Sequence, residues 1–190
     1  MSKKIPNDSE CICMLRDAGC KHRVIVHCCT VRAVADEMLN GIKGVNKELV
    51  VAGALLHDIG RSIDNTILHA CVGADIIGKL GLPKDLVEIV RKHTGAGLDD
   101  DDVRELGLPP GDYMPQTLEE KMVAHADNLV SGNRVTTHRH ASEKLISNNA
   151  PRGAERIEKL HWELSKLYGM DLDIISDIIG EYPRLKGVSN

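Results

Sequence analysis

The chain of 190 residues contains no Phe, one Trp and three Tyr. So few aromatic rings provide no platform on which the bases of single-stranded nucleic acid could stack. Acidic residues outnumber basic ones by 28 to 24. The resulting net charge of -4 does not supply the positive field on which non-specific nucleic-acid binding depends. We therefore expect no nucleic-acid partner.

Long apolar runs are also missing from the sequence. No segment approaches the roughly 18 consecutive apolar residues that a membrane span requires. The first six residues have no apolar run behind them, which argues against a secretory signal. The six Cys crowd the first 71 residues and match no standard zinc motif. These features predict a cytoplasmic protein without membrane contact, in which the thiols stay reduced.

Helical patterns dominate the rest of the chain. Apolar residues recur on one helical face within residues 21–40 and again within residues 157–167. Residues 95–116 form the one long stretch that we expect to be irregular, and no strand pattern is evident. The sequence predicts an all-α protein, a single domain over residues 1–190. Its C-terminal helices, about 151–180, would pack on the core, and the 157–167 stripe would be core or a homodimer surface.

Six polar residues have strongly apolar neighbours in the sequence and lie in or near five expected helices: His27, His57, Asp58, His69, His93 and Asp127. A polar side chain on an inward helix face is costly unless it is paired or bound to a metal. Imidazole and carboxylate groups together suit divalent ions of iron, manganese, zinc, cobalt or nickel. The pattern therefore predicts a shared metal centre.

The order His27, His57-Asp58 and Asp127 resembles the signature of the HD-domain metal-dependent phosphohydrolase superfamily. The strongest match is the run Leu-Leu-His-Asp-Ile-Gly-Arg over residues 55–61. The flanks of His69 and His93 resemble further motifs of the branch with two metals. Within that branch the chain is similar to small HD proteins, which include bacterial symmetric diadenosine tetraphosphatases and uncharacterised archaeal members. The resemblance covers residues 19–134, which would be the metal-binding core of an HD-domain helical bundle.

The resemblance implies a centre of two divalent ions, for which iron or manganese is the first choice. It assigns the first ion to four ligands: His27, His57, Asp58 and Asp127. Asp58 would bridge to the second ion, which His69 and His93 would complete. A hydroxide activated by this centre would cleave a phosphoanhydride, phosphodiester or phosphomonoester bond of a small, nucleotide-like substrate.

The same resemblance suggests which residues take part in the reaction. His57, Asp58 and Arg61 are the expected catalytic residues, with Arg61 stabilising the phosphoryl group. Many relatives carry Lys at this position, and Arg keeps the charge while adding a bidentate fork. Thr94 and Arg134 are the other expected substrate contacts.

Two other functions fit the same six residues. Some HD-domain relatives use this ligand set to hold a di-iron pair that activates oxygen, and a non-catalytic protein could sense a nucleotide. Of the remaining histidines, we expect a structural role for His125, and we expect His138 and His140 to face solvent or substrate. His22 and His161 carry no signal.

Overall fold

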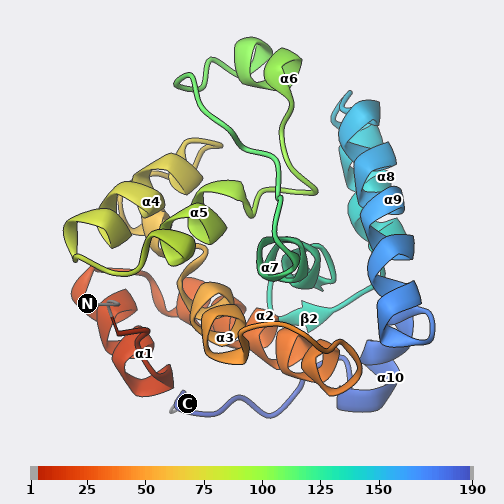
Figure 1. The fold of residues 1–190 in the computed structure, drawn as a ribbon, viewed down its shortest axis with the longest axis horizontal. Coiled ribbons are helices and arrows are strands. Elements are labelled where there is room, and N and C mark those ends of the chain that lie inside the picture. Colours follow the sequence, from red (N-terminus) through yellow and green to blue (C-terminus); the bar gives the residue numbers. More distant parts are fainter. Residues whose placement is uncertain (1–3, 189–190) are drawn as a thin grey trace.

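A computed structural model describes residues 4–188 and confirms the all-α prediction (Figure 1). The first helices are α1 (Asp8–Asp17), α2 (His22–Gly41), α3 (Lys47–Leu56), the 3-10 turn η1 (Ile59–Ser62), α4 (His69–Lys79) and α5 (Lys84–Lys92). They are followed by α6 (Asp100–Glu105), α7 (Leu118–Asn128), the strands β1 (Val130–Ser131) and β2 (Arg134–Val135), α8 (His138–Ser147), α9 (Pro151–Tyr168), η2 (Leu172–Ile174) and α10 (Ile175–Ile179).

Side-chain caps explain where several helices begin. Asn7, Asn46 and Thr117 precede α1, α3 and α7, and each side-chain oxygen accepts the backbone N–H three residues further along. This bond satisfies one of the amides that the first helical turn leaves without a partner. At Thr117 the side chain of Glu120 completes a capping box.

The centre of the molecule is formed by α2, α3 and α7, which contact one another, while α5 contacts both α3 and α7. In Figure 1, α7 is seen nearly end-on in the middle of the helices. The buried faces are aliphatic, with Val34 and Met38 of α2 and Leu55 of α3 almost fully enclosed. His27 of α2 and Asp127 of α7 therefore lie on helices that packing holds in fixed positions.

Residues 95–116 differ from the expectation, because they contain a short helix. The side chain of Asp99 accepts the N–H groups of Asp101 and Asp102, and α6 follows directly. Carboxylates in a first turn also interact favourably with the helix dipole. The acidic run thus begins a helix, which stands apart from α7 and faces the end of the α8–α9 pair (Figure 1).

The C-terminal helices pack on the core as predicted. The pair α8 and α9 lies along one side of the molecule, α9 contacts α7, and α10 contacts α2 (Figure 1). In α9, Ile157, Leu160 and Leu164 are buried, whereas Leu167 is exposed. The two strands, with only two residues each, are too short for an alternating pattern to appear in the sequence. Among the described helices, none has the length and apolar character to cross a membrane.

Candidate metal centre

The structure brings the six expected ligand residues together from separate elements. His27 lies in α2, His57 caps the end of α3 and Asp58 follows it. His69 is the first residue of α4, His93 caps the end of α5 and Asp127 lies in α7. His27 and Asp127 are half-buried, and the other four residues are buried.

Four of these residues surround one point. The Nε2 atom of His27 lies 2.9 Å from Oδ1 of Asp127 and 3.3 Å from Nε2 of His57. The Nε2 atom of His57 is 3.6 Å from the same Asp127 oxygen. Both Nε2 atoms lie 3.7 Å from Oδ2 of Asp58. Nitrogen and oxygen donors at these separations can surround a single divalent ion.

The other oxygen of Asp58 faces a second group. Its Oδ1 atom is 3.2 Å from Nε2 of His69 and 3.6 Å from Nε2 of His93. Those two nitrogen atoms are 3.1 Å apart. The carboxylate of Asp58 therefore lies between the two groups and presents one oxygen to each of them.

All four imidazoles point their Nε2 atoms inward for the same reason. Each Nδ1 atom is 2.6 to 2.8 Å from a backbone carbonyl oxygen. The accepting carbonyls belong to Gly132, Ala54, Thr66 and Val90. A carbonyl can only accept, so Nδ1 carries the proton and Nε2 of the neutral ring presents a lone pair. This is the usual arrangement of metal-binding histidine.

The charge states also fit a metal site. Burial lowers the pKa of His57 to about 4 and keeps this ring neutral. Burial acts to raise the pKa of Asp58, but His57, His69 and His93 outweigh it and hold that pKa well below its usual value. Burial likewise opposes ionisation of Asp127, yet His57 and His27 lower its pKa to about 2. Ionised carboxylates and a neutral imidazole are the forms that bind metals.

His27 differs from His57 in its charge state. Burial acts to lower its pKa, but its hydrogen bond to Asp127 and the nearby carboxylates raise the pKa to about 9. At neutral pH this ring therefore carries a second proton, which faces Asp127. A metal ion could bind His27 only as that proton leaves. The site as a whole fits a divalent ion. One sign of this is Oδ1 of Asp58, a buried oxygen that has no hydrogen-bond partner among the described residues.

The three expected substrate contacts have different surroundings. Arg61 lies at the centre, with Nε 2.6 Å from Oδ2 of Asp58 and Nη2 3.2 Å from Nε2 of His69. Thr94 follows His93, and its buried hydroxyl has no hydrogen-bond partner among residues 4–188. Arg134 is not brought to the group, because its exposed guanidinium pairs with Glu181 at 2.8 Å. Arg134 lines one hollow, and His27 and Arg61 line another.

That shared hollow has a volume of about 260 Å³ and gives access to the group. Its walls include His27, Arg61 and Asp127 on one side. Residues of α8, among them His140 and Lys144, form another part of the wall. His140 is exposed there, as expected.

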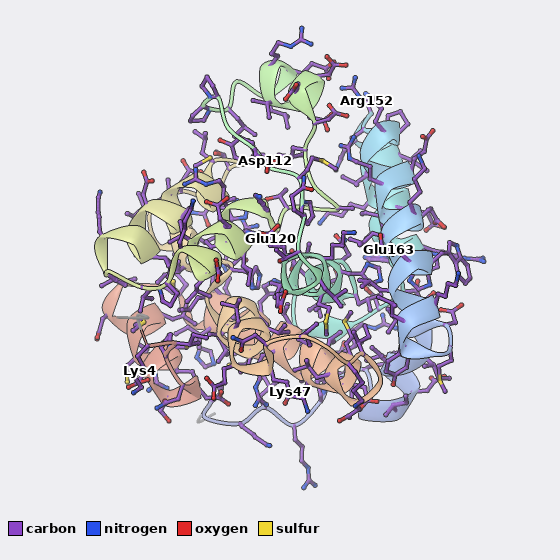
Figure 2. The ribbon with its side chains drawn as sticks, viewed as in Figure 1. Lys4, Lys47, Asp112, Glu120, Arg152 and Glu163 are labelled. Carbon is purple, nitrogen blue, oxygen red and sulfur yellow. The ribbon has the colours of Figure 1, made fainter. Side chains whose placement is uncertain are left out.

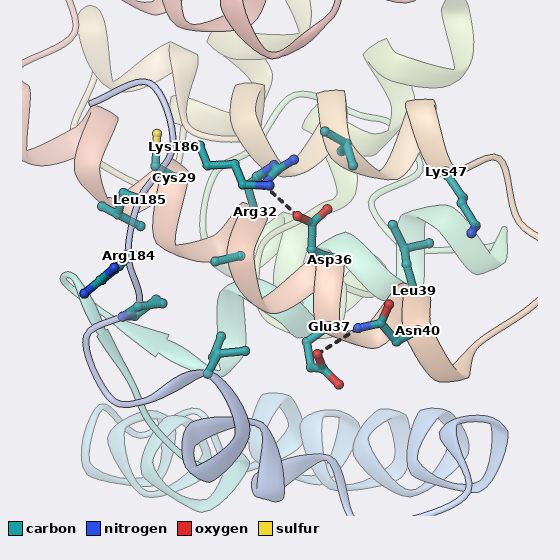
Figure 3. A pocket seen from close by; sticks show the side chains of 14 residues that line it. Cys29, Arg32, Asp36, Glu37, Leu39, Asn40, Lys47, Arg184, Leu185 and Lys186 are labelled. Atoms are coloured by element: carbon teal, nitrogen blue, oxygen red, sulfur yellow. Dashed lines mark hydrogen bonds and ion pairs between the residues drawn. The ribbon is translucent and has the colours of Figure 1, made fainter. Parts of the chain in front are cut away.

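A second pocket, shown in Figure 3, lies on α2 beneath the C-terminal segment and has a volume of about 490 Å³. Arg32 and Asp36 form an ion pair in it, and Asn40 donates to Glu37 (Figure 3). On a helix with about 100° per residue, Asp36 projects from the side of α2 opposite His27. None of the six expected ligands borders this pocket, so it is separate from the candidate metal centre.

The structure corrects the expectation for His138, which is buried rather than exposed. Its Nδ1 atom is 2.9 Å from Oδ2 of Asp173, and its ring stacks on that of His161 at a centroid distance of 3.5 Å. His161, which carried no signal in the sequence, also contacts Asp171 at 3.0 Å and His125 at 3.1 Å. These residues come from four separate elements, and His138 itself lies in a polar run, so no local pattern identified this cluster.

These side chains could also collect around an ion. A metal bound to an imidazole nitrogen lies close to the plane of the ring. The rings of His138 and His161 are nearly parallel, at 17°, and one lies above the other. One ion cannot lie in both planes, so this cluster is better explained as the polar contact that joins α7, α8, α9 and η2.

Residues 24–132 match the family model of the HD domain, and the chain belongs to that family of metal-dependent phosphohydrolases. The sequence is 45% identical over 174 residues to a tRNA (cytidine(56)-2'-O)-methyltransferase of Picrophilus torridus. The matched region covers 92% of this chain and 51% of that protein. It is 43% identical over 155 residues to an uncharacterised protein of Methanocaldococcus jannaschii, covering 78% and 91% of the two chains.

A solved structure, the HD domain of the L. monocytogenes phosphodiesterase PgpH in complex with cyclic-di-AMP, is similar with a TM-score of 0.45 and 19% identity. The similarity covers 82% of this chain and 95% of that one. The chain spans about half the length of the methyltransferase relative.

Proposed function

We propose that this chain is a metal-dependent phosphohydrolase that cleaves a phosphoanhydride, phosphodiester or phosphomonoester bond in a nucleotide-like substrate. The observation that carries the proposal is the position of Asp58, which presents Oδ2 to His27 and His57 and Oδ1 to His69 and His93. A carboxylate between two sets of imidazole donors suits a pair of ions.

Under this proposal His27, His57, Asp58 and Asp127 hold one ion, and Asp58, His69 and His93 hold the other. Two bound divalent ions supply Lewis acidity and lower the pKa of a bound water. The donor set is compatible with iron, manganese, zinc, cobalt or nickel, and iron or manganese is our first choice.

The other residues bind and orient the substrate. Arg61 lies beside the proposed metal ligands, and its guanidinium fork can bind two phosphoryl oxygens. The hydroxyl of Thr94 is buried without a partner among the described residues and can donate a hydrogen bond to a phosphoryl oxygen. Because Arg134 is paired with Glu181, we assign it no role in this arrangement.

RNA is a second candidate for the substrate, because one relative is named as a tRNA methyltransferase. The net charge of -4 and the few aromatic residues favour a small nucleotide over a long nucleic acid. A short oligoribonucleotide therefore belongs among the test substrates.

The test combines metal analysis with a phosphoester assay. We expect protein purified without oxygen to carry about two ions per chain. Replacing His69 or His93 by Gln should lower the count to about one, whereas the exposed His22→Gln should not change it. With manganese or iron, the protein should hydrolyse bis(p-nitrophenyl) phosphate or a diadenosine polyphosphate, and Asp58→Asn should abolish this activity.

Three results would overturn the proposal. A metal-loaded protein that is inert towards the whole panel, yet binds nucleotides tightly, would be a sensor. Turnover that consumes oxygen and releases no phosphate would identify an oxygenase. Full activity in Asp58→Asn would remove the basis of the proposed centre.

A further inference from the structure

A second hollow adjoins the one at the metal ligands. The second hollow has a volume of about 570 Å³ and lies between residues 94–98, α6 and the start of α9. Gly95, Leu145 and Asn148 border both hollows, so the two adjoin, and together they are called the groove here. Helices α8 and α9, which supply much of its wall, lie beyond the residues that match the HD-domain model.

The two ends of this groove differ in available positive charge. At the metal end, the exposed Lys144 forms no ion pair with any described residue. At the far end, Arg152 pairs with Asp102 at 3.0 Å and with Glu105 at 2.9 Å. Arg156 also pairs there, with Asp99 at 2.7 Å and with Asp102. Figure 2 shows Arg152 at the end of α9 that faces α6.

The far end also has a largely apolar wall, made by Ile67, Ala96, Leu98, Leu106, Leu145 and Pro151. Its volume falls within the range of about 300–1,000 Å³ that is typical for sites of organic ligands. The hollow at the metal end is smaller and is bordered by Lys144, which has no ion pair among the described residues, whereas the charged residues at the far end are paired. An anion therefore fits the metal end, and an uncharged organic group fits the far end.

We propose that this groove binds a nucleoside phosphate with at least two phosphate groups, in one orientation. Lys144 contacts the phosphate next to the one that is cleaved, and the nucleoside occupies the hollow between residues 94–98 and α9. Lys144 then makes the protein prefer two linked phosphates over one. The inference rests on the proposed function for the place of the cleaved phosphate.

Calorimetry on the manganese-loaded protein tests this with three ligands that resist hydrolysis: methylphosphonate, methylenediphosphonate and α,β-methylene-ADP. The unmodified protein should bind the diphosphonate more tightly than methylphosphonate. Lys144→Met should weaken diphosphonate binding about tenfold and affect methylphosphonate less, since a hydrogen bond to a charged group has about this value. Lys79→Met, an exposed lysine of α4 outside the groove, is the matched control and should change nothing.

The far end is tested by Asn148→Trp, which places a bulky side chain at the junction of the two hollows. Asn148 is exposed, so the substitution should not disturb the core. It should weaken α,β-methylene-ADP binding more than diphosphonate binding. Equal losses for all ligands, or the same loss in Lys79→Met, would overturn the inference. Because these measurements report binding, they remain decisive even if the phosphoester assay fails. If the protein hydrolyses phosphoesters but Lys144→Met leaves the preference for diphosphonate unchanged, only this inference is overturned and the proposed function stands.

Discussion

The Nε atom of Arg61 lies 2.6 Å from Oδ2 of Asp58, the oxygen that also faces His27 and His57. The same guanidinium approaches Nε2 of His69 at 3.2 Å. A permanently charged group thus interacts with the atoms that we propose as metal ligands. We therefore expect Arg61 and a metal ion to compete for Asp58, which would free the guanidinium to bind a phosphate.

Arg61→Met should therefore separate metal binding from turnover. Removing the positive charge should tighten metal binding, by about threefold to tenfold, because repulsion between cations is relieved. The same change should lower kcat/KM about 100-fold through loss of the phosphoryl contact. Metal affinity can be measured by competition with a chelator. Arg61→Lys, which keeps the charge, should bind metal as tightly as the unmodified protein does. Weaker metal binding in Arg61→Met would show that Arg61 and the metal ion do not compete for Asp58.

Removal of metal should destabilise the protein. Ions that bind only the folded chain stabilise it by mass action, by about 2.7 kcal/mol at 100 times the Kd. For a chain of this size that corresponds to about 5–10 °C in Tm for each bound ion. Dialysis against a chelator should lower Tm by this amount, and added manganese should restore it. Asp58→Asn should show no response to manganese, whereas an equal response in both proteins would place the ions elsewhere.

The buried His125 should make stability depend on pH. Burial, with smaller effects from His161 and His138, lowers the pKa of His125 to about 3. Below its unfolded value of about 6.5 the unfolded chain takes up a proton that the folded chain refuses. Stability should therefore fall as pH drops from about 6.5 towards 3, by at most about 1.4 kcal/mol per pH unit from this group.

The matched variant is His125→Gln, which keeps a hydrogen-bonding side chain but cannot titrate. In urea unfolding of metal-free protein, the free energy of unfolding should fall less steeply between pH 6 and pH 4 in the variant. The slope should be smaller by at most about 1.4 kcal/mol per pH unit, which corresponds to the uptake of one proton. Parallel pH profiles would show that His125 is protonated equally in both states.

The sequence predicted the convergence of the six polar residues, because each stands beside an apolar segment that had to be buried. It could not predict the His138 cluster, since His138 lies in a polar run and meets its partners only through the packing of α8, α9 and η2. The position of Arg134 depends on a turn with Gly132 at φ 65°, which directs the short hairpin towards Glu181. Helix α6 depends on its cap rather than on an apolar stripe.

The contact between Asp173 and α8 should control the groove without affecting the metal centre. Asp173 accepts the backbone N–H of His138 at 2.8 Å and contacts its ring at 2.9 Å. Asp173→Ala removes both contacts at the start of α8, which should cost about 1–3 kcal/mol. Asp177→Ala, an exposed residue of α10, is the control. Amide hydrogen exchange should quicken in α8, and the preference for diphosphonate should decline. The number of bound ions per chain should stay the same, because all six proposed ligands precede α8. A loss of metal in Asp173→Ala would show that the centre depends on the C-terminal helices.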